Sequence, residues 1–135
     1  QRFRTTIFSW HGSPPLLAAA GFGYFAALLA GGLHGAGWMD SASAGHLLAF
    51  AFLFPLVSGA AGHLLPLWLR PGRQTEWHDI ARQRLSYGGG VRALLFLAAG
   101  LLMLSGERWG ARLALAALLP FVLLAVWMVL QSRRA

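Results

Sequence analysis

Histidine is the residue type through which this sequence could do metal or heme chemistry. The chain has 5 histidines and no cysteine. Disulfides, thiolate metal sites and iron–sulfur clusters are therefore excluded, and imidazole is the strong metal ligand that remains. The histidines are His11, His34, His46, His63 and His78.

Two of these histidines belong to one long apolar stretch, AGHLLAFAFLFPLVSGAAGHLLPLWLR, which ends at Arg70. It is long enough to cross a hydrocarbon layer of about 30 Å at roughly 1.5 Å per helical residue. A polar side chain inside such a span is costly, so it usually faces the interior of a helix bundle and often binds a ligand there. His46 and His63 would stand roughly 25 Å apart along the helix, so they cannot ligate the same iron.

The composition places the whole chain in a membrane. Of its 135 residues, 57 % are hydrophobic and 11 % are charged, whereas a soluble domain has about 25 % charged residues. Long uniform apolar runs indicate helices rather than the alternating strands of a barrel. The sequence therefore predicts an all-α integral membrane protein surrounded by a lipid bilayer.

Four spans are predicted within a single transmembrane domain, 1–135. We expect a four-helix bundle, with Asp40 or Ser41 capping the second helix and a kink at Pro55. Between spans two and three, Thr75 can cap a short helix that lies at the headgroup level. The expected spans are about 14–36, 41–69, 91–105 and 111–131.

The basic residues indicate orientation rather than nucleic-acid binding. The net charge is +7, but all 11 basic residues are arginines, placed near the ends of apolar runs. Most of them fall in the two terminal segments and in the loop between spans two and three. The positive-inside rule then predicts a multi-pass protein of the bacterial inner membrane with both termini in the cytoplasm.

A heme site needs a neutral imidazole, an apolar slot and nearby cations. His46 meets the first two needs, with Phe50 and Gly59 on the same predicted helix. His34 would end the first helix at the same membrane face and can meet His46 across the bundle. The simpler alternatives are a hydrogen-bonded interfacial role for His46 and helix–helix packing at Gly59.

The other histidines have weaker claims. His63 is a candidate for a second metal site, although packing or an interfacial position is the simpler explanation. His11 and His78 are expected to be solvated interfacial residues. No intramembrane acid, serine–histidine–acid set or phosphate loop is visible in the sequence, so a proton-coupled transporter, a hydrolase and a kinase have no support.

The set His46, Phe50, Gly59, Pro66 and Trp68 resembles the second-helix region of the NnrS family of heme- and copper-containing membrane proteins. That region in turn is similar to a histidine-bearing helix of heme-copper oxidase subunit I. The resemblance covers the first four helices of such proteins and implies that His46 ligates a low-spin heme. The chain departs from the pattern at position 44, where an alanine replaces a second histidine, and the later ligand-bearing helices have no counterpart here. A complete catalytic centre is therefore not expected.

Two functions of different classes follow. The first is a small b-type heme protein of electron transfer or of a respiratory assembly, with His46 as one axial ligand and His34, a second copy or a partner chain supplying the other. The second is an accessory subunit without a cofactor whose small-residue faces contact larger membrane partners. Copper is a poorer candidate than heme, because the chain lacks cysteine and has only 3 methionines. Both functions imply a homo-oligomer or a larger membrane complex.

Overall fold

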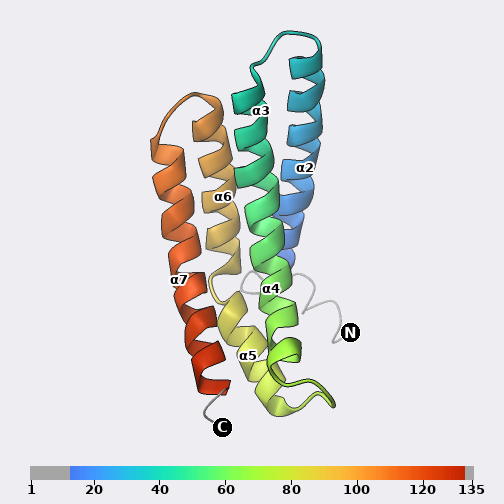
Figure 1. The fold of residues 1–135 in the computed structure, drawn as a ribbon, viewed down its shortest axis with the longest axis vertical. Helices are drawn as coiled ribbons and strands as arrows, with labels where there is room; N and C mark the ends of the chain where they lie inside the picture. Colours follow the sequence, from blue (N-terminus) through green and yellow to red (C-terminus); the bar gives the residue numbers. More distant parts are fainter. Residues whose placement is uncertain (1–12, 133–135) are drawn as a thin grey trace.

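Four apolar helices lie side by side and form an elongated bundle (Figure 1). The structure is a computed structural model that describes residues 13–132. In it, four helices are long and apolar enough to cross a membrane, which confirms the predicted all-α membrane bundle. The elements are α2 (Pro14–Gly35), α3 (Ser41–Leu47), η1 (Leu48–Leu53), α4 (Phe54–Leu69), α5 (Glu76–Ser86), α6 (Gly89–Leu104) and α7 (Trp109–Ser132).

The second span is one continuous helix built from α3, η1 and α4. It begins at Asp40, whose carboxylate accepts hydrogen bonds from the Ser43 N–H at 2.8 Å and from the Ser43 hydroxyl at 2.7 Å. Just before Pro55, where a kink was predicted, the span contains a π-helical segment, η1. Pro55 has no N–H to donate to the carbonyl four residues earlier, so the regular α-helical pattern cannot continue through it.

Small residues bring the helices close together around η1. Ala51 is buried between α2 and α6, where it faces Gly23 on one side and Gly100 on the other. A Cβ at Gly100 would lie 2.9 Å from the Ala51 Cβ, and one at Gly110 would lie 2.6 Å from the Ala99 carbonyl oxygen. Close approach through small residues is how membrane helices gain packing contacts in lipid.

The short helix α5 lies at the end of the bundle where α4 and α7 also end (Figure 1). It packs its buried residues Ala81 and Leu85 against Phe121 and Met128 of α7. The chain then turns at Gly88, which has a φ of 69°, a left-handed conformation that glycine adopts without the usual steric cost. This turn allows α6 to begin at once and run back through the bundle.

Candidate functional site

His46 lies in the last turn of α3 and is half-buried. Its ring contacts the Phe50 ring, with centroids 6.2 Å apart. Neither ring nitrogen forms a hydrogen bond with a described residue, and neither is sealed inside the protein. Within residues 13–132 the imidazole therefore has no hydrogen-bond partner, and it is accessible from outside the bundle.

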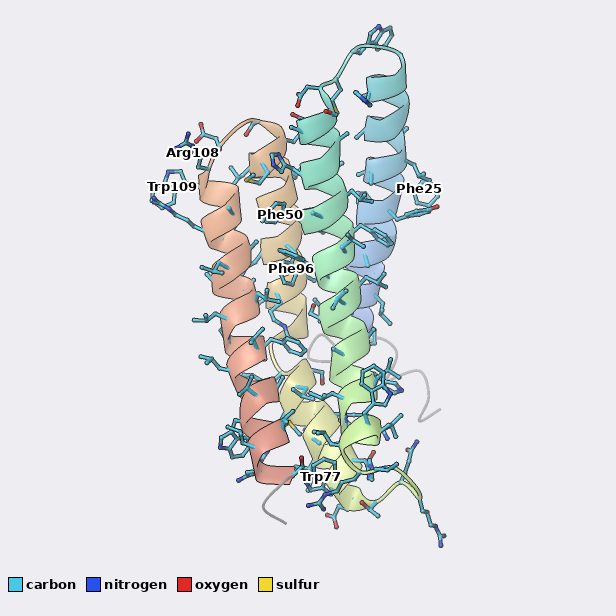
Figure 2. All side chains as sticks on the ribbon, in the orientation of Figure 1. Phe25, Phe50, Trp77, Phe96, Arg108 and Trp109 are labelled. Carbon is cyan, nitrogen blue, oxygen red and sulfur yellow. The ribbon has the colours of Figure 1, made fainter. Side chains whose placement is uncertain are left out.

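Below His46 the bundle is filled by aromatic rings. Phe50 contacts Phe54 at a centroid distance of 5.2 Å, and Phe54 contacts Phe96 of α6 at 5.9 Å. Figure 2 shows Phe50 and Phe96 on facing sides of the second span and α6. Phe96 is fully buried. Because these rings pack against one another inside the bundle, a heme held by His46 would lie toward the outer surface of the helices.

His34 lies in the last turn of α2 and is exposed. Its Nδ1 is 2.9 Å from the Met39 carbonyl oxygen. Because a carbonyl only accepts, Nδ1 carries the proton and Nε2 is left with its lone pair free, which is the arrangement that metal-binding histidines commonly use. Among the described residues, no hydrogen bond or ring contact joins His34 to His46.

Gly59 does not belong to a site at His46. A Cβ at Gly59 would lie 3.1 Å from the Leu16 Cβ, so this face of α4 is covered by α2. His46 and Gly59 are also roughly 20 Å apart along the helix, on nearly opposite faces. The simpler expectation for Gly59, helix–helix packing, describes its position.

The remaining candidate, His63, is exposed on α4 and makes no hydrogen bond with a described residue. No third metal-capable side chain joins it or His46: within residues 13–132, no group of three or more histidine, aspartate and glutamate side chains gathers around a common point. His63 and His46 lie at opposite ends of one span, and neither belongs to such a group.

The expectation that His78 is solvated was wrong. His78 is buried, with 2 % of its surface exposed. Its Nδ1 accepts from the Thr75 N–H at 3.0 Å and its Nε2 donates to the Arg70 carbonyl at 2.9 Å. Both nitrogens are used to fix the start of α5, so His78 is a structural residue. His11, the fifth histidine, lies outside the described residues.

Arg92 is a charged residue of α6 that was not among the residues predicted to form a site. It is buried near the start of α6, where its Nη2 donates to the Leu85 carbonyl at 2.9 Å and its guanidinium lies 4.8 Å from the Phe121 ring centroid. The signal was available, because Arg92 is the only charge within the predicted third span. A charge inside a membrane span marks a functional site by default.

The fold and these positions define a class: an all-α membrane protein, a four-span bundle with one accessible, unsatisfied imidazole at each end of its second span. Comparisons of the chain with protein-family models, with curated proteins and with solved structures give no match. The length and apolar composition of the four helices support this class.

Proposed function

We propose that this chain is a small b-type heme protein of a bacterial inner membrane, with both termini in the cytoplasm, acting in electron transfer or as the heme-bearing subunit of a respiratory assembly. The observation that supports this most is the state of His46. Its imidazole is half-buried in a span and lacks a hydrogen-bond partner among the described residues. An imidazole in that position is available to a metal, because no described residue bonds to either of its nitrogens.

The aromatic rings determine where the cofactor would bind. Because Phe50, Phe54 and Phe96 fill the interior, the heme would lie on the outside of the bundle, with one face toward His46. Its other face needs cover from lipid-excluding protein, which a second copy of the chain or a partner subunit would supply. The second axial ligand would then be His34, whose Nε2 is free, or a histidine of the neighbouring chain. Such a ligated heme supplies one-electron transfer when bound.

Absorption spectroscopy of the full chain purified after expression with heme tests the proposal. We expect a Soret band and reduced-minus-oxidised b-type bands, and we expect His46→Ala to abolish them. His63→Ala is the matched control, since His63 is the other accessible imidazole of the same span, and it should leave the spectrum unchanged. A colourless wild-type protein, or a spectrum that His46→Ala does not alter, would reject His46 as the ligand.

A second function, an accessory subunit without a cofactor, is favoured by a different observation. On α2, a Cβ at Gly21, Gly31 or Gly32 would meet no atom within 4 Å, so these small residues are not used for packing within the described part of the bundle. Such a bundle can act purely as a packing partner of larger membrane proteins. Co-purification with a respiratory complex, together with an isolated chain that stays colourless, would support this function over the first.

A further inference from the structure

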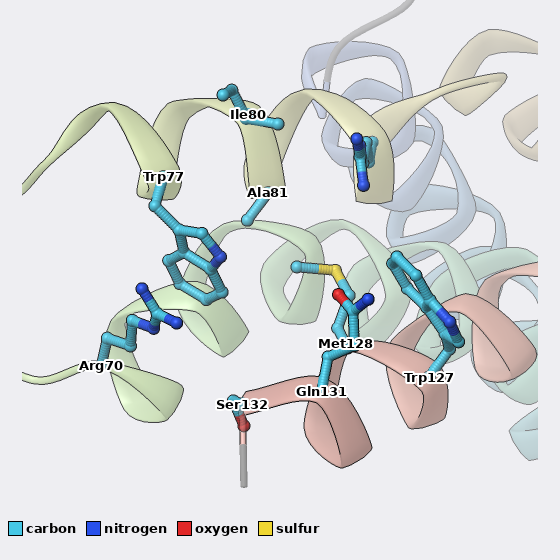
Figure 3. A pocket seen from close by; sticks show the side chains of 9 residues that line it. Arg70, Trp77, Ile80, Ala81, Trp127, Met128, Gln131 and Ser132 are labelled. Atoms are coloured by element: carbon cyan, nitrogen blue, oxygen red, sulfur yellow. The ribbon is translucent and has the colours of Figure 1, made fainter. Parts of the chain in front are cut away.

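A hollow of about 550 Å³ opens at the end of the bundle where α7 ends. It lies between α5, α7 and Arg70, the residue at which α4 ends. Figure 3 shows the Trp77 ring facing into it from α5, with Met128, Gln131 and Ser132 opposite on α7. The residues that matter for binding are Arg70, Trp77, Arg84, Trp127, Gln131 and Ser132.

The hollow is positively charged and contains no acid. The Arg70 guanidinium lies 4.4 Å from the Trp77 ring centroid, and that of Arg84 lies 6.0 Å from the Trp127 ring centroid. The ion pair recorded among residues 13–132 joins Arg82 to Asp79 instead. Two guanidinium groups therefore border one hollow, and neither forms an ion pair with a carboxylate of residues 13–132.

A second hollow, of about 370 Å³, lies beside the first, and Arg84 lines both. It runs between α6 and α7, and most of its other lining residues are apolar, including Leu95, Ala116, Pro120 and Leu124. Since α6 and α7 are membrane-spanning helices, this groove faces the hydrocarbon of the bilayer. A ligand that filled both hollows would need an anionic end and an apolar chain.

Arg92 adds a third cation to this path. It lines the groove, and only 8 % of its surface is exposed. Its Nη2 is bonded to a carbonyl oxygen, but its Nε is buried without a hydrogen-bond partner. A buried guanidinium is costly in a membrane, and a phosphate held at Arg84, which lines the same groove, would lower that cost.

We propose that the hollow bordered by Arg70 and Arg84 binds the phosphate of an anionic phospholipid, with one acyl chain of that lipid in the α6–α7 groove. Arginine binds phosphate through paired, charge-assisted hydrogen bonds, and basic pockets between membrane helices are a known setting for anionic headgroups. Trp77 and Trp127 flank the site, as tryptophans do at headgroup level. Free phosphate would satisfy the arginines equally well but would leave the groove unused. The lipid is thus the better match, and the inference does not depend on heme.

Native mass spectrometry of the full chain in detergent micelles tests the proposal. The protein is titrated with phosphatidylglycerol or with phosphatidylcholine of the same acyl chains. We expect the wild type to retain phosphatidylglycerol preferentially, and Arg84→Gln to weaken that binding about tenfold, the effect of losing one hydrogen bond to a charged group. Arg73→Gln is the matched control, because Arg73 is an exposed arginine of the α4–α5 loop that lines neither hollow.

A second variant separates lipid from free phosphate. Ala116→Trp fills the groove and keeps both Arg70 and Arg84 in the chain, so it should reduce phosphatidylglycerol binding, whereas Leu115→Trp at the neighbouring exposed position should not. Equal retention of the two lipids, or wild-type binding by both Arg84→Gln and Ala116→Trp, would overturn the proposal. Displacement of phosphatidylglycerol by millimolar inorganic phosphate, with no effect of Ala116→Trp, would overturn it in favour of a phosphate site.

Discussion

The backbone carbonyl oxygen of Ala51 in η1 occupies the place that a side chain at Gly23 of α2 would need. Pro55, four residues after Ala51, cannot donate to this carbonyl, so the helix widens there and turns its backbone toward α2. On the other side of η1, Gly100 of α6 lies against the side chain and backbone of the same Ala51. The π-helical segment is thus held between two glycines, and the spans meet there backbone to backbone.

Gly23→Ala should destabilise the bundle at this contact. The new methyl group would overlap the Ala51 carbonyl, and backbone atoms cannot move away as a flexible side chain could. We expect the free energy of unfolding to fall by about 1–3 kcal/mol, the usual cost of overpacking. Unfolding in mixed detergent micelles, followed by circular dichroism, measures the change.

The control for this variant stands two residues earlier in the same helix. A Cβ at Gly21 would meet no atom within 4 Å, and alanine is favoured over glycine in a helix by about 1 kcal/mol. Gly21→Ala should therefore be neutral or stabilising. Equal loss of stability in the two variants would show that the Ala51 contact is not what Gly23 provides.

Phe96→Ala should destabilise the protein by leaving a hole at the end of the aromatic series. The ring is fully buried against Phe54. In lipid the solvent-transfer part of the cost is small, so the packing and cavity part remains, roughly 2 kcal/mol or more. Phe25, which is 71 % exposed and points outward in Figure 2, supplies the control. If Phe25→Ala cost as much in the same unfolding measurement, the interior packing described here would be contradicted.

His78→Ala should loosen the start of α5. The variant leaves the Thr75 N–H and the Arg70 carbonyl without the imidazole that joins them, a loss of about 1–3 kcal/mol. We expect faster proteolysis between residues 70 and 76 and a lower melting temperature. His63→Ala removes an exposed ring without hydrogen bonds and should change neither quantity. Unchanged cleavage of the His78 variant would mean that other contacts hold the loop.

Much of the fold could be predicted from the sequence because membrane spans are a signal of length and polarity. The long apolar runs predicted four spans, and Asp40 before Ser41 predicted the cap that the structure contains. Pro55 indicated a break in the second span, but not its form. Whether a helix kinks or widens at a proline depends on the neighbouring helix, which here is α2 with Gly23. Which helix packs there is decided by the tertiary structure and cannot be read from the local sequence.

The candidate site was harder to predict, because a residue type does not reveal which face of a helix it occupies. Gly59 follows His46 by 13 residues on one helix, and its face of that helix packs against Leu16 of α2. His78 resembled a solvated residue, since the Arg70 carbonyl that its Nε2 meets is a backbone group, which the sequence does not single out. The phospholipid hollow joins residues of α5 and α7, which are far apart in the chain, so spacing alone could not indicate it.

The cap at Asp40 should make stability depend on pH at the acid end. Hydrogen bonds from the side chain and backbone of Ser43 hold the pKa of the Asp40 carboxyl below its ordinary value of 3.8. A carboxyl with a lowered folded-state pKa stabilises the fold fully above its unfolded value, and this contribution is lost as pH falls through the folded value. Thermal unfolding of the wild type between about pH 2 and 6 should therefore show a loss of stability below about pH 4. Asp40→Asn keeps a capping side chain that does not titrate, so its curve should be flatter than that of the wild type over this window. Parallel curves would show that other carboxyls cause the acid dependence.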